Sequence, residues 1–170
     1  MQGCLQLAQE GIGHVAPNPL VGAQLVRDDH VIGAGFHREY GSQHAEVEAI
    51  EAAGKDVDLS DTTLYVNLEP CLHEGKTPPC CDLIIAREIQ KVVVGSLDPN
   101  PAVQGRGVAR LREAGIAVST DILRAEEAWL LPSKQARMPF FQSGPVVPRG
   151  RLLGEGAELD PMSGGHAGQC

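Results

Sequence analysis

Hydrophobic and polar positions in the first third of the chain predict a helix, a loop and a hairpin. Residues 3–11 fit a short helix, and the following stretch "HVAPNPLVG" fits a loop, because each proline biases the preceding residue to extended geometry. The apolar runs "VGAQLVRD" and "HVIGAGFHR" are joined around two aspartates. This pattern is typical of a β-hairpin with a short turn.

The pattern then alternates between helical and strand periodicity. Alanines repeat at helical spacing over residues 44–53, and Gly54 supplies a stop. Strands are predicted at "TTLYVNL", "KVVVGS" and "IAVSTDI", and helices at "PCCDLIIARE" and "GRGVARLREAG". Strands separated by single helices favour parallel pairing with right-handed crossovers. We therefore expect an α/β fold, a three-layer α/β/α sandwich with a mixed five-stranded sheet.

The end of the chain has a different composition. Residues 132–170 contain seven glycines and five prolines among 39 residues, and they follow neither periodicity apart from the short apolar patch "MPFF". We expect one domain over residues 1–131 and an irregular Gly/Pro-rich tail over residues 132–170.

Charge and targeting signals narrow the range of partners. The 170 residues carry 14 Lys and Arg against 22 Asp and Glu, a net charge of −8, which argues against binding to nucleic acid. The N-terminal stretch "MQGCLQLAQEGIG" lacks the basic start and apolar core of a signal peptide. Since no stretch approaches the roughly 20 apolar residues of a membrane span, we expect a cytoplasmic protein without a membrane partner.

Cysteine placement indicates a metal site. Three of the five cysteines fall within eleven residues, and Cys71 and Cys80 flank the junction between a predicted strand and a predicted helix. Catalytic zinc typically takes three protein ligands and keeps a fourth position for water. His44, at a predicted helix start, is the natural third ligand, and Glu46 in the same first turn can move protons beside it. Cys81 points about 100° away from Cys80 and is expected to be buried.

These residues resemble the signature of the zinc nucleobase deaminases, in which zinc activates a water for attack on an amidine carbon. The usual cysteine spacing is two residues, and here it is eight. Together with "PNPLVGA", "GFHREYGSQHAEVEAI" and "DPNPAVQGRG", the segment "PCLHEGKTPPC" resembles the deaminase domain of the RibD enzymes of riboflavin biosynthesis, over about residues 5–123. The resemblance implies the cytidine-deaminase-like fold. It also implies 2,5-diamino-6-ribosylamino-4(3H)-pyrimidinone 5′-phosphate as substrate, and 5-amino-6-(5-phosphoribosylamino)uracil and ammonia as products.

The same resemblance assigns roles to individual residues. His44, Cys71 and Cys80 match the ligands of one zinc ion per chain, and Glu46 matches the proton shuttle. Seven polar residues match positions around the substrate, namely Asn18, His37, His73, Lys76, Thr77, Asp98 and Asn100. A cation and a hydroxyl donor at Lys76 and Thr77 suit a phosphate, and an amide at Asn18 suits a pyrimidine edge. Leu72 and Glu74 depart from the family pattern, which predicts an altered substrate affinity.

The tail bears on the reductase activity that RibD enzymes commonly carry beside the deaminase. RibD chains commonly continue into an NADPH-dependent reductase domain, which 39 residues are too few to build. The tail glycines also lack the strand-to-helix context of a dinucleotide site, so NADPH is not expected to bind. A separate reductase is a candidate partner, and a homo-oligomer is a further expectation from the fold. Whether the chain is a single-domain enzyme or a truncated bifunctional one stays open.

Two other functions stay open at this point. One is another deaminase of the same fold, acting on tRNA adenosine, cytidine or guanine, although the acidic charge and the eight-residue spacing count against tRNA. The other is a non-catalytic zinc module that partners a reductase. Glu46 counts against that function, because holding zinc does not require it.

Overall fold

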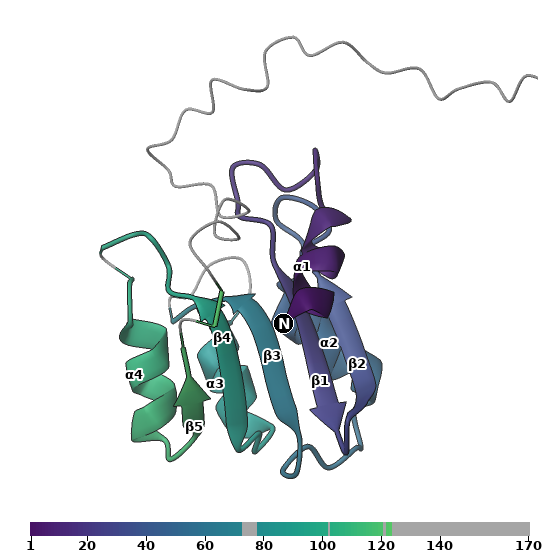
Figure 1. Ribbon diagram of the computed structural model, residues 1–170, viewed down its shortest axis with the longest axis vertical. Coiled ribbons are helices and arrows are strands. Elements are labelled where there is room, and N and C mark those ends of the chain that lie inside the picture. Colours follow the sequence, from purple (N-terminus) through teal and green to yellow (C-terminus); the bar gives the residue numbers. More distant parts are fainter. Residues whose placement is uncertain (73–77, 102, 121, 124–170) are drawn as a thin grey trace, which may run out of the picture. The chain divides into compact units, whose positions relative to one another are not determined.

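The computed structural model describes residues 1–72, 78–101, 103–120, 122 and 123. Each predicted element is present in order (Figure 1): α1 Gln2–Gln9, β1 Gly22–Arg27, β2 His30–Phe36, α2 Ala45–Ala53, β3 Thr63–Leu68, α3 Cys80–Ala86, β4 Lys91–Ser96, α4 Arg106–Glu113 and β5 Ala117–Ser119. The last strand is three residues long where the pattern predicted seven. It is an edge strand, and its pairing with β4 extends only from Lys91 to Val93.

The strands form one mixed sheet in the order β2-β1-β3-β4-β5, which confirms the predicted fold class (Figure 1). Strand β1 pairs antiparallel with β2 and with β3, whereas β3, β4 and β5 pair in parallel. The carboxyl ends of β2, β3, β4 and β5 therefore meet at one edge of the sheet, together with the start of β1. We call this edge the site edge, because every described candidate residue follows or precedes a strand there.

Helices α1 and α2 cover opposite faces of the sheet. A Cβ at Gly22 would lie 2.2 Å from the carbonyl oxygen of Cys4 in α1, and a Cβ at Gly35 would lie 2.6 Å from the backbone nitrogen of Ala49 in α2. Gly35 pairs with Ala23, the neighbour of Gly22. Since consecutive strand residues point to opposite faces, the two helices lie on different sides.

The main core lies between the sheet and helices α2, α3 and α4. Its buried side chains are mostly aliphatic and come from both layers: Leu25, Leu64, Val66, Val92 and Val94 from the sheet, and Ile50, Ile84, Val108 and Leu111 from the helices. Burial of this surface, at roughly 25 cal/mol per Å² of apolar area, is the main force that holds the helices to the strands.

The predicted tail, residues 132–170, lies outside the described residues, so the boundary at residue 131 stays a prediction. Among the helices that the structure describes, each is too short or too polar to cross a membrane.

Candidate metal centre

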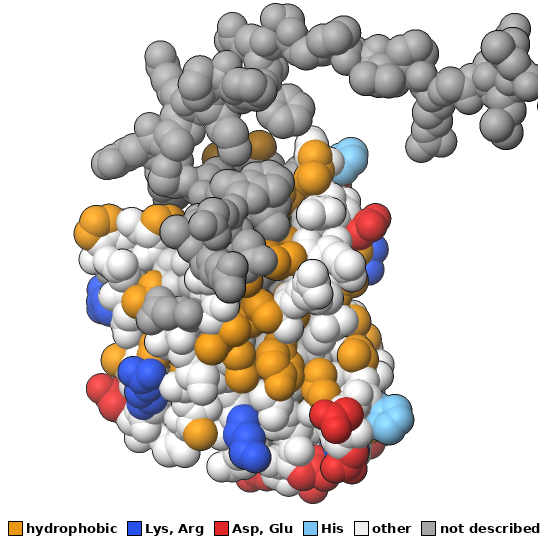
Figure 2. Space-filling model, in the orientation of Figure 1, with side chains coloured by type: hydrophobic (Ala, Val, Ile, Leu, Met, Phe, Trp, Pro, Cys, Tyr) orange, Lys and Arg blue, Asp and Glu red, His pale blue; other side chains and the backbone are white. Residues whose placement is uncertain are grey.

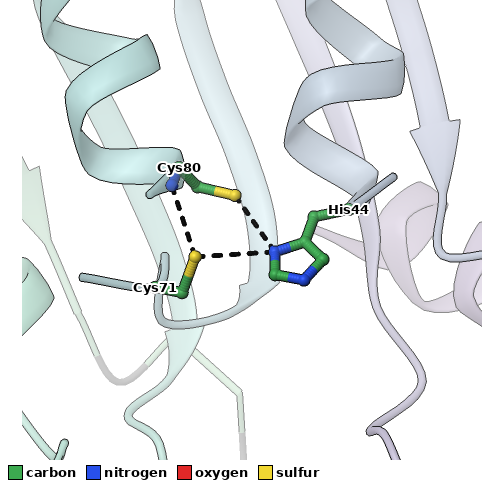
Figure 3. A group of neighbouring side chains, drawn as sticks. All are labelled: His44, Cys71 and Cys80. Atoms are coloured by element: carbon green, nitrogen blue, oxygen red, sulfur yellow. Dashed lines mark hydrogen bonds between the residues drawn. The ribbon is translucent and has the colours of Figure 1, made fainter. Parts of the chain in front are cut away.

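The three predicted ligands meet at the site edge (Figure 3). His44 is the N-cap of α2, with extended backbone angles of φ −76° and ψ 158°, so its imidazole reaches past the end of the helix. Cys71 follows β3, and Cys80 opens α3. Their ligand atoms all lie within 4.8 Å of one another, and Figure 3 shows the side chains converging from three separate segments.

Distances within this group fit a zinc ion. His44 Nδ1 lies 3.3 Å from Cys80 Sγ and 3.5 Å from Cys71 Sγ. Tetrahedral zinc with Zn–N near 2.0 Å and Zn–S near 2.3 Å requires nitrogen and sulfur ligands about 3.5 Å apart. One imidazole and two thiols at this spacing can therefore hold zinc and still leave its fourth position open.

Hydrogen bonds within the group favour a thiolate at Cys71. The pKa of Cys71 is lowered to about 4, mainly because the Cys80 thiol donates a hydrogen bond to it, with a further contribution from His44. The backbone N–H of Cys80 also donates to Cys71 Sγ at 3.3 Å. The same shared proton, together with burial, raises the pKa of Cys80. The first N–H of α3 therefore stabilises a thiolate at Cys71, while Cys80 itself keeps its proton.

His44 takes part in the same proton network. Its pKa is raised, chiefly because Cys71 accepts its N–H. Metal binding requires deprotonated sulfur and an unprotonated imidazole nitrogen. A cation at the centre of the group would therefore replace the protons that the three side chains otherwise share.

Glu46 lies in the first turn of α2 and is only 3% exposed. Its pKa is raised to about 7, first because burial disfavours the charged carboxylate and second because of the charge on Cys71. It contacts the Cys80 thiol but does not belong to the group of three close ligand atoms. A buried carboxyl group with a pKa near neutrality can both accept and return a proton.

Asn18 and His37 form a pair beside the metal centre. The Nδ1 atom of His37 lies 2.9 Å from the carbonyl oxygen of Gln43, and its Nε2 lies 3.0 Å from Asn18 Nδ2. Because a carbonyl oxygen only accepts, Nδ1 carries the proton and Nε2 accepts from the Asn18 amide. The His37 ring meets the His44 ring edge-on, with centroids 5.6 Å apart.

Of the other predicted substrate residues, Asp98 and Asn100 lie on the segment that follows β4. Asp98 Oδ1 accepts the backbone N–H of Asn100 at 2.8 Å, so this carboxylate already stabilises its own turn. Residues 73–77, which include His73, Lys76 and Thr77, lie outside the described residues. The roles of these five residues stay predictions.

Sequence reasoning missed two buried polar residues at the end of β3. Asn67 accepts the backbone N–H of Gly22 at 2.8 Å and donates to the carbonyl oxygen of Leu20 at 3.0 Å, which fixes the segment behind Asn18. Glu69 accepts backbone N–H groups from the region after β4. The signal was present in "TLYVNLEP", since an amide and a carboxylate in an apolar strand require partners when they are buried.

The chain is similar to known proteins over most of its length. The sequence model of the protein family "cytidine and deoxycytidylate deaminase zinc-binding region" matches residues 1–96 of this chain. The riboflavin biosynthesis protein RibD of Synechocystis is 48% identical over 145 residues, which cover 82% of this chain and 39% of that protein. The diaminohydroxyphosphoribosylamino-pyrimidine deaminase of Buchnera aphidicola is 44% identical over 126 residues, which cover 74% of this chain and 84% of that protein.

A solved structure agrees with these sequence matches. The diaminohydroxyphosphoribosylaminopyrimidine deaminase/5-amino-6-(5-phosphoribosylamino)uracil reductase of Thermotoga maritima superposes with a TM-score of 0.72 at 49% identity. The match covers 77% of this chain and 38% of that one. The chain thus spans about two fifths of the RibD relatives but most of the Buchnera deaminase. It belongs to the cytidine and deoxycytidylate deaminase family and, within it, to the diaminohydroxyphosphoribosylaminopyrimidine deaminases of riboflavin biosynthesis.

Proposed function

We propose that the chain catalyses the hydrolytic deamination of 2,5-diamino-6-ribosylamino-4(3H)-pyrimidinone 5′-phosphate. One water is consumed, a carbon–nitrogen bond is replaced by a carbon–oxygen bond, and 5-amino-6-(5-phosphoribosylamino)uracil and ammonia leave. The observation that carries this proposal is the convergence of His44, Cys71 and Cys80 beside the buried carboxyl group of Glu46. It is supported by relatives that bear the name of this deaminase.

Each chain would hold one zinc ion through His44, Cys71 and Cys80. When bound, zinc lowers the pKa of a coordinated water toward roughly 7 and so supplies a nucleophile at neutral pH. Partial exposure of His44 and Cys71 leaves the open side of the group accessible, whereas Cys80 closes the side toward the core. The Cys80 side of the group is therefore buried, and the substrate can approach from the side of His44 and Cys71.

Glu46 would carry the proton between the two halves of the reaction. Its carboxylate accepts a proton from the attacking water and later delivers it to the departing amino nitrogen. Burial raises its pKa to about 7, which makes both directions of transfer accessible near neutral pH. Its burial in the first turn of α2 keeps bulk water away from the proton that it holds.

Asn18 would recognise the pyrimidine edge. Its Nδ2 is directed at His37, which leaves Oδ1 to accept a hydrogen bond from an amino group of the substrate. His37 would fix this orientation, because its own Nδ1 is held by the carbonyl oxygen of Gln43. Lys76 and Thr77 would bind the phosphate, as the family resemblance predicts.

The distribution of charge is compatible with a phosphorylated substrate despite the net charge of −8. Acidic side chains gather at the lower end of the molecule in Figure 2, which is the end of the sheet opposite the site edge. The topology places exposed acids there, in the β1–β2 turn and before β3: Asp28, Asp29, Asp56, Asp58 and Asp61. Much of the repulsion of an anionic substrate is therefore kept at the far end.

A substrate panel tests this proposal. Purified, zinc-loaded protein is incubated with the pyrimidinone ribosyl phosphate, cytidine, guanine or tRNA, and released ammonia is measured. We expect one ammonia for each uracil product from the pyrimidinone phosphate alone. Ammonia from cytidine, guanine or tRNA but not from this substrate would contradict the proposal. Absence of ammonia from all four substrates, with zinc bound, would favour a non-catalytic zinc module.

A further inference from the structure

A buried carboxylate next to the metal centre is not used by the chemistry proposed above. Glu69 follows the last residue of β3, lies two residues before Cys71 and is only 5% exposed. In the part of the chain that the structure describes, its hydrogen-bond partners are backbone N–H groups from another segment. A buried charge requires such partners, because an unpaired one costs several kcal/mol.

The two carboxylate oxygens of Glu69 accept hydrogen bonds from both ends of one loop. Oε2 accepts the N–H of Asp98 at 3.1 Å and the N–H of Gly105 at 2.9 Å. Oε1 accepts the N–H of Gly107 at 2.8 Å and the N–H of Val108 at 3.1 Å. One side chain thus holds the beginning of the segment after β4 and the first turn of α4.

Glycine at position 107 permits this close approach. A Cβ there would lie 2.2 Å from the carbonyl oxygen of Pro70 and 3.2 Å from Glu69 Oε1. The first turn of α4 therefore rests directly on the turn that leads from β3 to Cys71. Gly105, with φ +78°, begins the helix in a left-handed conformation that favours glycine.

The loop fixed in this way contains Asp98 and Asn100, two of the predicted substrate residues. Glu69 consequently connects the turn that carries a zinc ligand with the loop that would contact the substrate. A glutamine could not serve equally well, because its NH₂ group would face two backbone N–H donors in place of an acceptor.

We propose that Glu69 is a positioning residue, which sets the loop of Asp98 and Asn100 relative to Cys71 and so governs substrate affinity. This inference rests on the proposed deaminase function. It assigns Glu69 no contact with the reacting atoms, and so separates it from Glu46.

Glu69→Gln tests the proposal, with Asp82→Asn as its matched control. Asp82 is an exposed carboxylate linked to the same helix through Arg110 at 3.5 Å, but it accepts no loop N–H from residues 98–108 among the described contacts. We expect Glu69→Gln to retain zinc, to raise KM for the pyrimidinone phosphate at least about tenfold and to change kcat less. The control should keep both constants.

Hydrogen exchange supplies a readout that does not depend on activity. In Glu69→Gln the amides of Asp98, Gly105, Gly107 and Val108 should exchange faster, while those of β1 should not change. Unchanged exchange at these amides, or a fall in kcat with an unchanged KM, would overturn the proposal. An inactive wild-type protein would contradict the deaminase function alone, since the exchange experiment would still decide whether Glu69 holds the loop.

A second variant covers the case in which Glu69→Gln does not fold. Glu69→Asp keeps the charge but shortens the side chain by one methylene, so it can reach only part of the loop. We expect Glu69→Asp to fold and to bind zinc. Its KM should rise, but by less than the KM of a folded variant that lacks the carboxylate. Wild-type KM together with wild-type exchange in Glu69→Asp would overturn the positioning role.

Discussion

Cys80 and Cys81 are neighbours in the sequence but lie in different chemical environments. Cys80 Sγ faces His44 at 3.3 Å, whereas the Cys81 thiol donates to the carbonyl oxygens of Pro70 and Gly107 at 3.5 and 3.6 Å. Burial raises the pKa of Cys81 to about 12, so it remains a thiol. The angle of about 100° between successive helical residues separates Cys80, a candidate metal ligand, from Cys81, a core residue.

Cys80→Ser should therefore lose zinc, while Cys81→Ser should keep one zinc per chain. A hydroxyl is a poor zinc ligand, but at position 81 it can donate to the same two carbonyl oxygens that the thiol contacts. Metal analysis of the two purified variants checks this expectation. Zinc retained by Cys80→Ser and lost from Cys81→Ser would reverse the ligand assignment.

Glu46→Gln should separate metal binding from chemistry. The neutral amide has the same shape, so zinc content and fold should be unchanged, whereas turnover should fall by at least roughly 10²-fold. Glu48→Gln is the matched control: it lies in the same helical turn, where Glu48 pairs with Arg38 at 2.8 Å. The control should turn over at nearly the wild-type rate. Comparable turnover in Glu46→Gln would remove Glu46 from the mechanism.

The proximity of His44, Cys71 and Cys80 could be predicted from local patterns, whereas their roles as ligands stay predictions. His44 and Cys80 could be placed together because each lies at the start of a predicted helix and each has a side chain that binds zinc. The role of Glu69 could not be predicted, because its partners are backbone N–H groups 29 to 39 residues away and backbone groups leave no trace in a sequence. The stretch "TLYVNLEP" indicates only that Asn67 and Glu69 need polar partners when buried, and the fold decides which backbone groups these are.

At the scale of elements, close packing of α2 on β2 sets the position of His44. Gly33 and Gly35 face the helix, and its opposing residues include the buried Ala45 and Ala49. The alanine pattern predicted this helix correctly, and Gly54, with φ +105°, ends it as expected. The length of β5 was not predictable from its pattern, because its pairing partner exists only in the folded sheet.

Gly35→Ala should move α2 and weaken the metal centre at its N-terminus. The added methyl group would meet the Cβ of Glu48 at 2.5 Å and the backbone nitrogen of Ala49 at 2.6 Å. Such overpacking lowers the free energy of unfolding by about 1–3 kcal/mol, and zinc should be lost to a chelator more readily than from the wild type. Thermal unfolding and chelator titration measure the two effects.

Ala34→Ser serves as the control for Gly35→Ala. Ala34 lies on the same strand but on the opposite face, where it pairs with Gln24. The free energy of unfolding of Ala34→Ser should differ from that of the wild type by less than about 0.5 kcal/mol, and zinc retention should be unchanged. Equal effects of the two substitutions would mean that the contact of α2 with β2 does not control the position of His44.

At the scale of the molecule, the parallel direction of β2, β3, β4 and β5 brings the described site residues to one edge. The alternation of helices and strands predicted parallel pairing, and the hairpin predicted one antiparallel pair. The insertion of β1 between β2 and β3 was not predictable, because strand order depends on contacts between distant segments. The antiparallel pairing of β1 with β2, which the hairpin predicted, places Asn18, before β1, next to His37, after β2.

Residues 138–170 are rich in Gly and Pro and contribute no predicted ligand, proton carrier or substrate residue. A chain ending at Arg137 should keep zinc and retain kcat/KM for deamination within about threefold, because terminal segments without site residues tolerate removal. The full 170 residues, supplied with substrate and NADPH together, should release ammonia and leave NADPH unoxidised, since the tail sequence does not predict the strand, Gly-rich turn and helix of a dinucleotide site. Ammonia and NADPH are followed in the same reaction. Loss of deamination on truncation would show that the tail completes the site. NADPH consumption by the 170-residue chain, without another protein, would contradict a single activity.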